Sequence, residues 1–192
     1  MDVTVHGTRV TVAEFEAFCD LPENLDRDFQ LIAGEIVEMP SNFKASKTSM
    51  LIGHYLLAYV LEHELGHVTG EAGGYMLEGD VYVPDAAFIS YARQRTLSEK
   101  GFGQIPPDLA VEVVSADTSA ENENLMFKLG TYLAVGTIVW IVRPKKKTVE
   151  VYIPGALPRI YSVDETLDGG TVLPGFTLPV RNIFPVPPPE TT

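Results

Sequence analysis

Two strand-like runs each carry an acidic side chain, and this combination constrains the fold more than any other feature of the sequence. The runs are VYVPDAAFIS, residues 81–90, and PPDLAVEVVS, residues 106–115. Both are rich in apolar and β-branched residues and are bounded by Gly, Pro or polar residues, as strands are. Asp85 follows Pro84 in the first run, and Glu112 lies inside the second. An unpaired carboxylate inside an apolar strand costs on the order of several kcal/mol, so each of these residues requires a compensating partner.

A bound metal ion is the simplest partner for two such carboxylates. The alternative is structural: Asp85 would cap the turn after Pro84, and Glu112 would pair with a buried Arg or Lys. Each residue taken singly is compatible with either interpretation. The pair therefore predicts a metal site and leaves the structural alternative open.

The length of 192 residues suits one domain of ordinary size, which we expect over residues 1–185, followed by a disordered Pro-rich tail at 186–192. The single cysteine, Cys19, excludes an intramolecular disulfide. The N-terminal residues lack the positive start and apolar segment of a signal peptide, and no stretch is long and apolar enough to span a bilayer. These features predict a cytoplasmic protein without a membrane partner.

The formal net charge of −12 argues against broad electrostatic capture of nucleic acid. Residues 1–40 hold nine acids and two bases, which account for −7 of that charge, so any nucleic-acid face is expected elsewhere. Each candidate contact has a solvated surface position as its alternative. The candidates are Lys44, Lys47, Arg93, Arg95, Lys100, Arg143, Lys145, Lys146 and Lys147.

Hydrophobic periodicity and capping residues predict both helices and strands. Thr11 and Glu14 form a capping-box pattern before a helix at 12–19, apolar spacing predicts a long buried helix at 47–65, and a third helix is expected at about 120–135. Strand patterns predict two short strands joined through Gly34, a curved meander of three strands within 67–91, and a strand on each side of the KKK turn at 145–147. This order predicts an α/β or α+β fold with a mixed sheet flanked by helices.

Several weak motifs also occur in an order typical of a known family. They are FQLIAGEIVEMP, the buried helix, VPDAAFIS, PDLAVEVVS, the helix carrying Lys128 and Tyr132 before AVG, and the closing LPGFTL. From Phe15 to Phe184 the chain resembles the bacterial domain family of putative restriction endonucleases, a branch of the PD-(D/E)xK nuclease superfamily. The resemblance implies a restriction-endonuclease-like fold with a central mixed, curved sheet. It also implies a metal site made by Asp85, Glu112 and, with them, Glu35.

The sequence departs from the superfamily pattern at several positions. The lysine expected two residues after the acid is Val114 here, and the resemblance to this branch implies that Lys128 on the following helix replaces it. An acid often found four residues before that lysine is Asn124, and the usual Glu-Tyr-Trp triplet reads IVW at 138–140. These departures support a second hypothesis, in which the fold serves as a nucleic-acid or protein-binding module without catalysis.

The segment HELGHVTG, residues 63–70, matches the H-E-x-x-H motif of zinc proteases. On a helix, His63 and His67 would bind zinc from one face and Glu64 would activate water, which gives a third hypothesis, a zinc metallopeptidase. The longer protease signature requires a third His where this chain has Gly73. In the competing interpretation Gly66 ends the helix and His67 begins a strand, so the two histidines separate.

The favoured hypothesis is a Mg²⁺-dependent or Mn²⁺-dependent endonuclease that hydrolyses DNA. Asp85, Glu112 and the main-chain carbonyl of Val113 would hold the ion, and Glu35 would bind it directly or through water. Lys128 would orient the attacking water or offset developing charge. Two carboxylates held together without metal should raise the pKa of at least one of them. Cleavage of both strands of a duplex would favour a homodimer.

Overall fold

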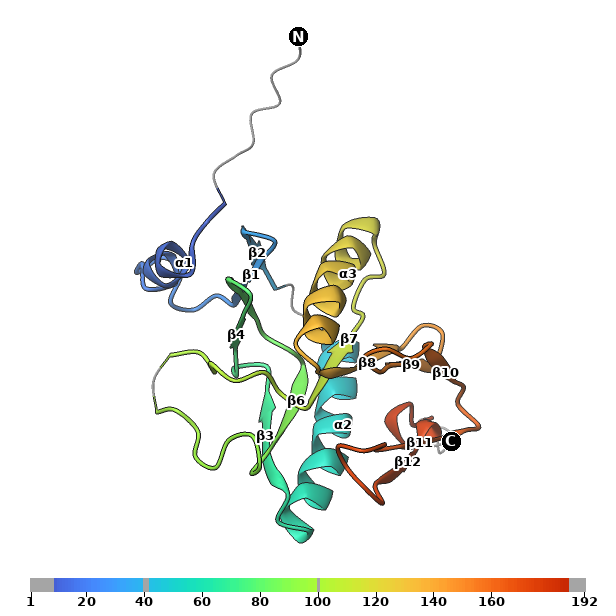
Figure 1. Cartoon of the computed structure of the whole chain (residues 1–192). Helices are drawn as coiled ribbons and strands as arrows, with labels where there is room; N and C mark the ends of the chain where they lie inside the picture. Colours follow the sequence, from blue (N-terminus) through green and yellow to red (C-terminus); the bar gives the residue numbers. More distant parts are fainter. Residues whose placement is uncertain (1–8, 40–41, 100, 187–192) are drawn as a thin grey trace, which may run out of the picture.

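A mixed sheet flanked by helices forms the centre of the molecule (Figure 1), as the order of predicted elements indicated. The computed structural model describes residues 9–39, 42–99 and 101–186. The predicted Pro-rich tail lies outside the described residues except for Val186. No described helix combines the length and the apolar character that crossing a bilayer requires.

The central sheet has six strands in the order β10-β9-β8-β7-β6-β3. Its strands are β3 (Gly66–Gly70), β6 (Ala86–Ser90), β7 (Leu109–Val113), β8 (Ile138–Arg143), β9 (Thr148–Tyr152) and β10 (Arg159–Tyr161). Strands β7 and β8 are parallel, and a parallel pair requires a crossover, which α3 (Ser119–Ala134) supplies. Val113 lies opposite Val142, so β7 and β8 end at the same edge of the sheet.

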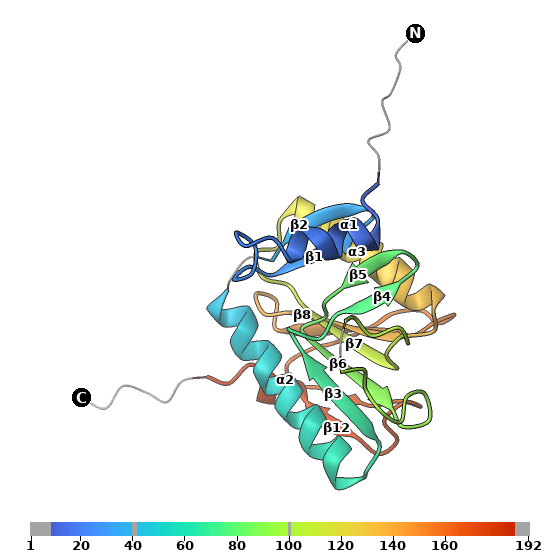
Figure 2. The same cartoon turned by 90° about the vertical axis from the view of Figure 1, so that its left-hand side faces the viewer.

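The long helix α2 (Phe43–Glu62) packs along one face of this sheet (Figure 2). Ile52, Leu56 and Val60 recur at helical spacing and are almost fully buried against β7 and β8. The helix begins four residues before the predicted Lys47, because the Asn42 side chain accepts the first free main-chain N–H groups. The predicted buried helix is therefore present with an earlier, capped start.

The other two helices have bounds set by threonine caps. Helix α1 (Val12–Cys19) has the predicted bounds, and both hydrogen bonds of the Thr11–Glu14 capping box are present. Helix α3 begins after Thr118, whose side chain accepts the N–H of Glu121. Leu125 and other apolar residues of α3 pack on the face of the central sheet opposite α2.

A second sheet, of four strands in the order β2-β1-β5-β4, lies on the α3 side of the molecule. Its strands are β1 (Phe29–Ile32), β2 (Glu35–Glu38), β4 (Tyr75–Leu77) and β5 (Asp80–Tyr82). The hairpin through Gly34 is as predicted, but the single three-stranded meander is wrong. Four strands occupy residues 66–90, and they divide between two sheets because the turn at Glu78 and Gly79, both with positive φ, returns β5 onto β1.

The C-terminal part of the described chain covers the far end of α2. It forms a small sheet of β11 (Thr166–Asp168) and β12 (Thr177–Pro179), followed by the 3₁₀ helix η1 (Val180–Ile183). Leu173, Phe176 and Leu178 of the closing LPGFTL segment are buried in the same cluster as α2. The Tyr59 hydroxyl fixes this layer by donating to the carbonyl of Pro174 at 2.6 Å.

Candidate active site

A cavity of about 470 Å³ lies where β7 ends and β6 begins. The β1–β2 hairpin, the first turn of α2, the loop after β7 and helix α3 surround it. Ala86 pairs with Val111 across the antiparallel β6–β7 ladder, so Asp85 and Glu112 follow at adjacent positions of the two chains. The polar lining residues are Asp28, Gln30, Glu38, Asn42, Ser46, Glu71, Asp85, Glu112, Ser115, Thr118, Glu121, Asn124 and Lys128.

The Asp85 carboxylate is held by the main chain of the neighbouring strand. The Oδ2 atom of Asp85 accepts the N–H of Val113 at 2.6 Å. The main-chain carbonyl of Asp85 accepts the Ser49 hydroxyl at 2.9 Å. Burial, reinforced by the nearby charge of Glu112, raises the pKa of Asp85 to about 7. Two carboxylates therefore repel each other here, and a cation between them would relieve that repulsion.

Glu112 is buried on the α3 face of β7. Side chains alternate along the strand, so Val111 and Val113 contact the α2 cluster while Glu112 points the other way. Its side chain accepts hydrogen bonds from Lys128 Nζ at 2.6 Å and from the Tyr132 hydroxyl at 3.1 Å. Burial raises the pKa of Glu112, and the charge of Lys128 opposes that rise.

Lys128 and Tyr132 come from adjacent turns of α3 and meet the same carboxylate. Only 4% of Lys128 is exposed, so its charge depends on Glu112 for compensation. Burial raises the pKa of Tyr132 well above its usual range, which keeps the phenol protonated and able to donate. The structure thus brings together Asp85 from the residue before β6, Glu112 from β7 and Lys128 from α3.

The main-chain carbonyl of Val113 faces the same region. The N–H of Val114 donates to the main-chain carbonyl of Val142 in β8. The N–H and C=O of Val113 therefore face the other edge of the strand, toward Asp85. Strand β6 begins at Ala86 and does not extend alongside this carbonyl. Asp85, Glu112 and Val113 therefore offer oxygen atoms within one region.

Glu35, the fourth predicted site residue, is not among the residues lining the cavity. It pairs with Ile32 beside Gly34 at the tip of the β1–β2 hairpin and is exposed. Ile32 and Val37 line the cavity, so Glu35 lies at the hairpin end, beyond the part of β2 that reaches it. Glu35 therefore does not join Asp85, Glu112 and Lys128 in lining the cavity.

Several lining residues were not singled out from the sequence. Gln30 lies in the buried strand β1 and accepts the N–H of Val83, two residues before Asp85. Glu71, in the turn after β3, adds a smaller repulsive contribution to the raised pKa of Asp85. A glutamine in an apolar strand was a usable signal for Gln30, whereas nothing local in the sequence brings Glu71 to this cavity.

Glu121 organises the loop that borders the cavity. Its carboxylate accepts the main-chain N–H groups of Ser115, Ala116 and Asp117 and the Ser115 hydroxyl. Thr118 and Glu121 have the spacing of a capping box, which was an available sequence signal for this residue. The loop after β7 is thereby fixed to the start of α3.

The HELGH segment does not form a helical zinc motif. Helix α2 ends at Glu62, Glu64 adopts a positive φ of 52°, and His67 lies in strand β3. The His63 ring stacks on Tyr59, and the His67 Nε2 atom lies 3.2 Å from the carbonyl oxygen of Arg95. The interpretation in which the two histidines separate is confirmed, and the metallopeptidase hypothesis loses its geometric basis.

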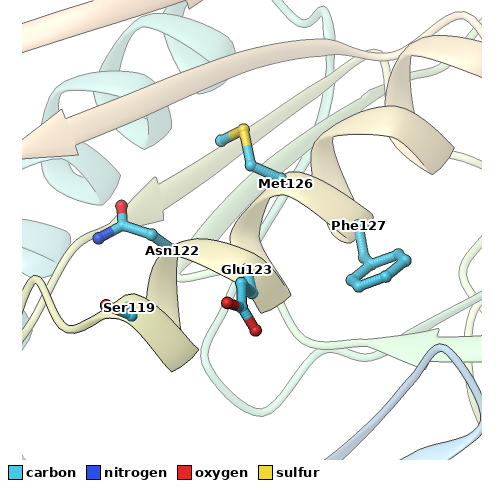
Figure 3. Close-up of a pocket in the computed structure, with 5 residues that line it drawn as sticks. All are labelled: Ser119, Asn122, Glu123, Met126 and Phe127. Atoms are coloured by element: carbon cyan, nitrogen blue, oxygen red, sulfur yellow. The ribbon is translucent and has the colours of Figure 1, made fainter.

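A second hollow, of about 420 Å³, lies on the outer surface of α3 (Figure 3). It is lined by Ser119, Asn122, Glu123, Met126 and Phe127, all from one helix, and their side chains do not converge. Asn122 is already hydrogen-bonded to the side chains of Asp117 and Arg143. This hollow offers no group of titratable side chains that acts together, so we place the candidate site at β7.

The donor atoms at the end of β7 suit a hard cation. Within the described ranges, no three or more His, Cys, Asp or Glu side chains are grouped to hold a metal ion. The candidate set is instead two carboxylates and one main-chain carbonyl. Mg²⁺ is commonly bound by one or two carboxylates while it keeps several waters, so this set fits Mg²⁺, and the oxygen donors also suit Mn²⁺.

Comparisons with known proteins bear on the family and the fold of the chain. Residues 12–181 match the family model Uma2, described as "Putative restriction endonuclease". The fold is similar to the crystal structure of a putative nuclease belonging to DUF820 from Anabaena variabilis ATCC 29413. The TM-score is 0.78, with 21% sequence identity, over 91% of this chain and 97% of that chain. This likeness confirms the predicted fold. No match was found among curated proteins.

Proposed function

Because the chain belongs to the Uma2 family of putative restriction endonucleases, as the resemblance of its motifs predicted, we propose that it is a metal-dependent nuclease that hydrolyses DNA phosphodiester bonds. The observation that carries the proposal is the convergence of Asp85, Glu112 and Lys128 in one cavity. A volume of about 470 Å³ accommodates a phosphate with its adjoining sugar, whereas a duplex must remain outside.

Asp85, Glu112 and the carbonyl of Val113 would hold Mg²⁺ or Mn²⁺. When bound, such an ion polarises a phosphoryl oxygen and lowers the pKa of a bound water. The protein contributes the positions of its ligands: the Val113 N–H fixes Asp85, and Tyr132 fixes one oxygen of Glu112. These contacts reduce the reorganisation needed when substrate enters.

Lys128 would supply the positive charge at the reacting phosphate. Its ammonium lies 2.6 Å from Glu112 Oε2 and has two further N–H groups able to donate into the cavity. Its surroundings are largely apolar, so its field acts on a nearby phosphate with less screening than at the surface. Lys128 would thereby offset the negative charge that develops on the phosphate during hydrolysis.

Plasmid cleavage tests the proposal. The purified protein should nick or cut plasmid DNA in Mg²⁺ or Mn²⁺ and lose this activity in EDTA. Asp85→Ala and Glu112→Gln should reduce cleavage at least a hundredfold, and the exposed Glu62→Gln should cleave like the unmodified protein. Cleavage that survives in Asp85→Ala would come from a contaminant and would remove the basis of the proposal.

One observation favours a second candidate, a nucleic-acid or protein-binding module without catalysis. Both oxygens of Glu112 already accept hydrogen bonds from protein donors, so the carboxylate is satisfied without a metal. Calorimetric titration with Mg²⁺ separates the two candidates. Binding that disappears in Glu112→Gln supports the nuclease, whereas DNA binding without Mg²⁺ binding or turnover supports the module.

We also propose that duplex cleavage uses two copies of the chain, because one cavity would cleave one strand of the duplex. Light scattering during gel filtration should then give twice the 21.0 kDa mass of one chain, with or without a short duplex. A monomer in both conditions would limit the protein to cutting one strand at a time.

A further inference from the structure

Most basic side chains in the described part of the chain are neutralised by carboxylates. Each of the following has a carboxylate oxygen within 4 Å: Arg9, Arg27, Arg93, Lys128, Arg143, Arg159 and Arg181. The described bases without such a partner are Arg95 and five exposed lysines, Lys44, Lys47, Lys145, Lys146 and Lys147, which we call the rim lysines. Lys100 lies outside the described residues.

The rim lysines come from two segments that meet beside the cavity. Asn42, two residues before Lys44, donates a side-chain hydrogen bond to the carbonyl of Ser115 at 3.3 Å. Lys145 Nζ donates to the carbonyl of Ala116 at 2.5 Å. Ser115 and Ala116 both line the cavity, so the first turn of α2 and the β8–β9 turn flank the same short loop.

The topology explains why these segments meet. Strands β7 and β8 are parallel and in register at Val113 and Val142, so the loop after β7 and the turn after β8 leave the same edge of the sheet. Helix α2 begins at this edge on the other side of the loop, and Lys44 and Lys47 are exposed in its first turns. Arg95, in contrast, follows the end of β6 farthest from Asp85.

Among the described residues, the charge distribution favours a polyanion at this rim. The chain carries −12 overall and the cavity interior is acidic, so a nucleic acid is repelled from most of the surface. The five rim lysines flank one loop, and although Asp117 in that loop offsets part of the charge of Lys145 and Lys146, together they create a local attraction over about one Debye length, roughly 8–10 Å at physiological salt. Their long side chains suit phosphate contacts, which are independent of sequence.

We propose that the rim lysines bind the phosphate backbone of a nucleic-acid strand that crosses the cavity mouth over residues 115–118. The lysines of α2 would contact phosphates on one side of the scissile position, and those of the β8–β9 turn would contact phosphates on the other. The strand is thereby held at two places with the intervening phosphate above Lys128. The location rests on the proposed nuclease function, but the binding itself is measured separately.

Fluorescence anisotropy with labelled 30-nucleotide DNA, as single strand and as duplex, tests the binding in EDTA, where no cleavage occurs. Lys44→Ala/Lys47→Ala and Lys145→Ala/Lys146→Ala/Lys147→Ala should each weaken binding at least tenfold. The dependence of log K on log salt should become shallower by about 0.9 for each duplex phosphate contact removed and about 0.7 for single strands. RNA of the same length shows whether the backbone alone is recognised.

A matched pair of single variants controls for the loss of charge itself. Lys47→Ala and Arg95→Ala each remove one exposed cation that has no carboxylate within 4 Å, but only Lys47 belongs to a segment beside the cavity loop, whereas Arg95 lies over the Tyr91 ring. Lys47→Ala should weaken binding and Arg95→Ala should leave both affinity and salt dependence unchanged, with equal melting temperatures. The proposal is overturned if the rim variants bind as tightly as the unmodified protein, or if Arg95→Ala loses as much affinity.

Hydrolysis of bis(p-nitrophenyl) phosphate separates this inference from the proposed function. This small diester has no extended backbone, so the rim variants should hydrolyse it normally while their KM for DNA rises and kcat for DNA is kept. Binding through the rim lysines without turnover in any metal would remove the nuclease and leave the inference standing. DNA cleavage with an unchanged KM in both multiple variants would remove the inference and leave the nuclease standing.

Discussion

At the scale of single residues, the buried contact of Lys128 with Glu112 is where stability and chemistry depend on the same atoms. Both side chains are more than nine-tenths buried, and the Tyr132 hydroxyl satisfies the second oxygen of Glu112. A buried ion pair contributes little net stability relative to apolar residues, but removing one partner leaves an uncompensated charge. Its retention inside an apolar cluster is therefore better explained by function than by stability.

A double-mutant cycle measures this coupling. Lys128→Met should lower the free energy of unfolding by about 3–5 kcal/mol, because it leaves the Glu112 charge unpaired. Lys128→Met/Glu112→Leu should recover much of that loss, and Tyr132→Phe should cost only about 1–2 kcal/mol. Urea denaturation at constant pH provides the measurement. Additive losses in the double variant would mean that the pair does not interact.

The raised pKa of Asp85 predicts a specific pH dependence of stability in EDTA. Its pKa is about 7 in the folded protein against an ordinary value of 3.8, so the unfolded chain releases this proton first. The folded state consequently loses stability as pH rises from about 4 to 7, and Asp85→Asn removes that loss. The variant should be more stable than the unmodified protein by about 2–4 kcal/mol at pH 8.

Urea denaturation of both proteins from pH 4 to pH 8 checks this sign. The advantage of Asp85→Asn should shrink as pH falls below 7 and should be small near pH 4, where Asp85 is neutral in the folded protein and about half protonated in the unfolded chain. A constant difference across this range would show that the carboxyl does not titrate with a raised pKa.

The two acidic site residues were found from one sequence signal. Asp85 and Glu112 are charges within apolar, strand-like runs, so their cost was visible without coordinates, whereas the role of Lys128 came from the family resemblance. Glu71 was missed because its proximity to Asp85 arises from the pairing of β3 with β6. Glu35 came from the family resemblance, which does not fix how far the hairpin that carries it extends.

At the scale of secondary-structure elements, the start of α3 determines the shape of the cavity edge. Glu121 at this helix start accepts three consecutive N–H groups of the loop after β7. Glu121→Ala should lower the free energy of unfolding by about 1–2 kcal/mol, because it leaves these donors without their acceptor. It should also increase amide hydrogen exchange at residues 115–117.

The exposed Glu123 on the same helix provides the matched control. Glu123→Ala removes an equal charge but no described hydrogen bond to the loop, so its stability and exchange at residues 115–117 should match those of the unmodified protein. Mass spectrometry after deuterium exchange provides the measurement. Equal exchange in the two variants would mean that the loop is held by its other contacts.

The positions of the helices were more predictable from the sequence than the pairing of the strands. The bounds of α1 followed from its capping box, and α3 lay within one residue of its expected span, since caps and periodicity are local. The alternation over residues 66–90 identified strand segments, but pairing depends on which chain lies beside each strand. The division of these strands between two sheets is set by the Glu78–Gly79 turn and by contact of β5 with β1, neither of which alternation reveals.

At the scale of the whole molecule, the net charge of −12 determines how any cation affects stability. Self-repulsion destabilises a compact polyanion, so monovalent salt should stabilise the protein by screening alone. A divalent ion bound at Asp85 and Glu112 should add a contribution that screening cannot supply, because binding to the folded state alone stabilises it by RT ln(1 + [L]/Kd). The two effects are separated by comparing salts at equal ionic strength.

Mg²⁺ at a hundredfold excess over its Kd should stabilise the folded state by about 2.7 kcal/mol. For a chain of this length that corresponds to a rise in melting temperature of about 5–10 °C relative to KCl of equal ionic strength. The difference should disappear in Glu112→Gln and should remain in Glu62→Gln, which loses the same charge at the exposed end of α2. If Mg²⁺ and KCl stabilise the unmodified protein equally, these carboxylates hold no divalent ion. If Glu112→Gln keeps the difference, the ion binds elsewhere on this acidic surface.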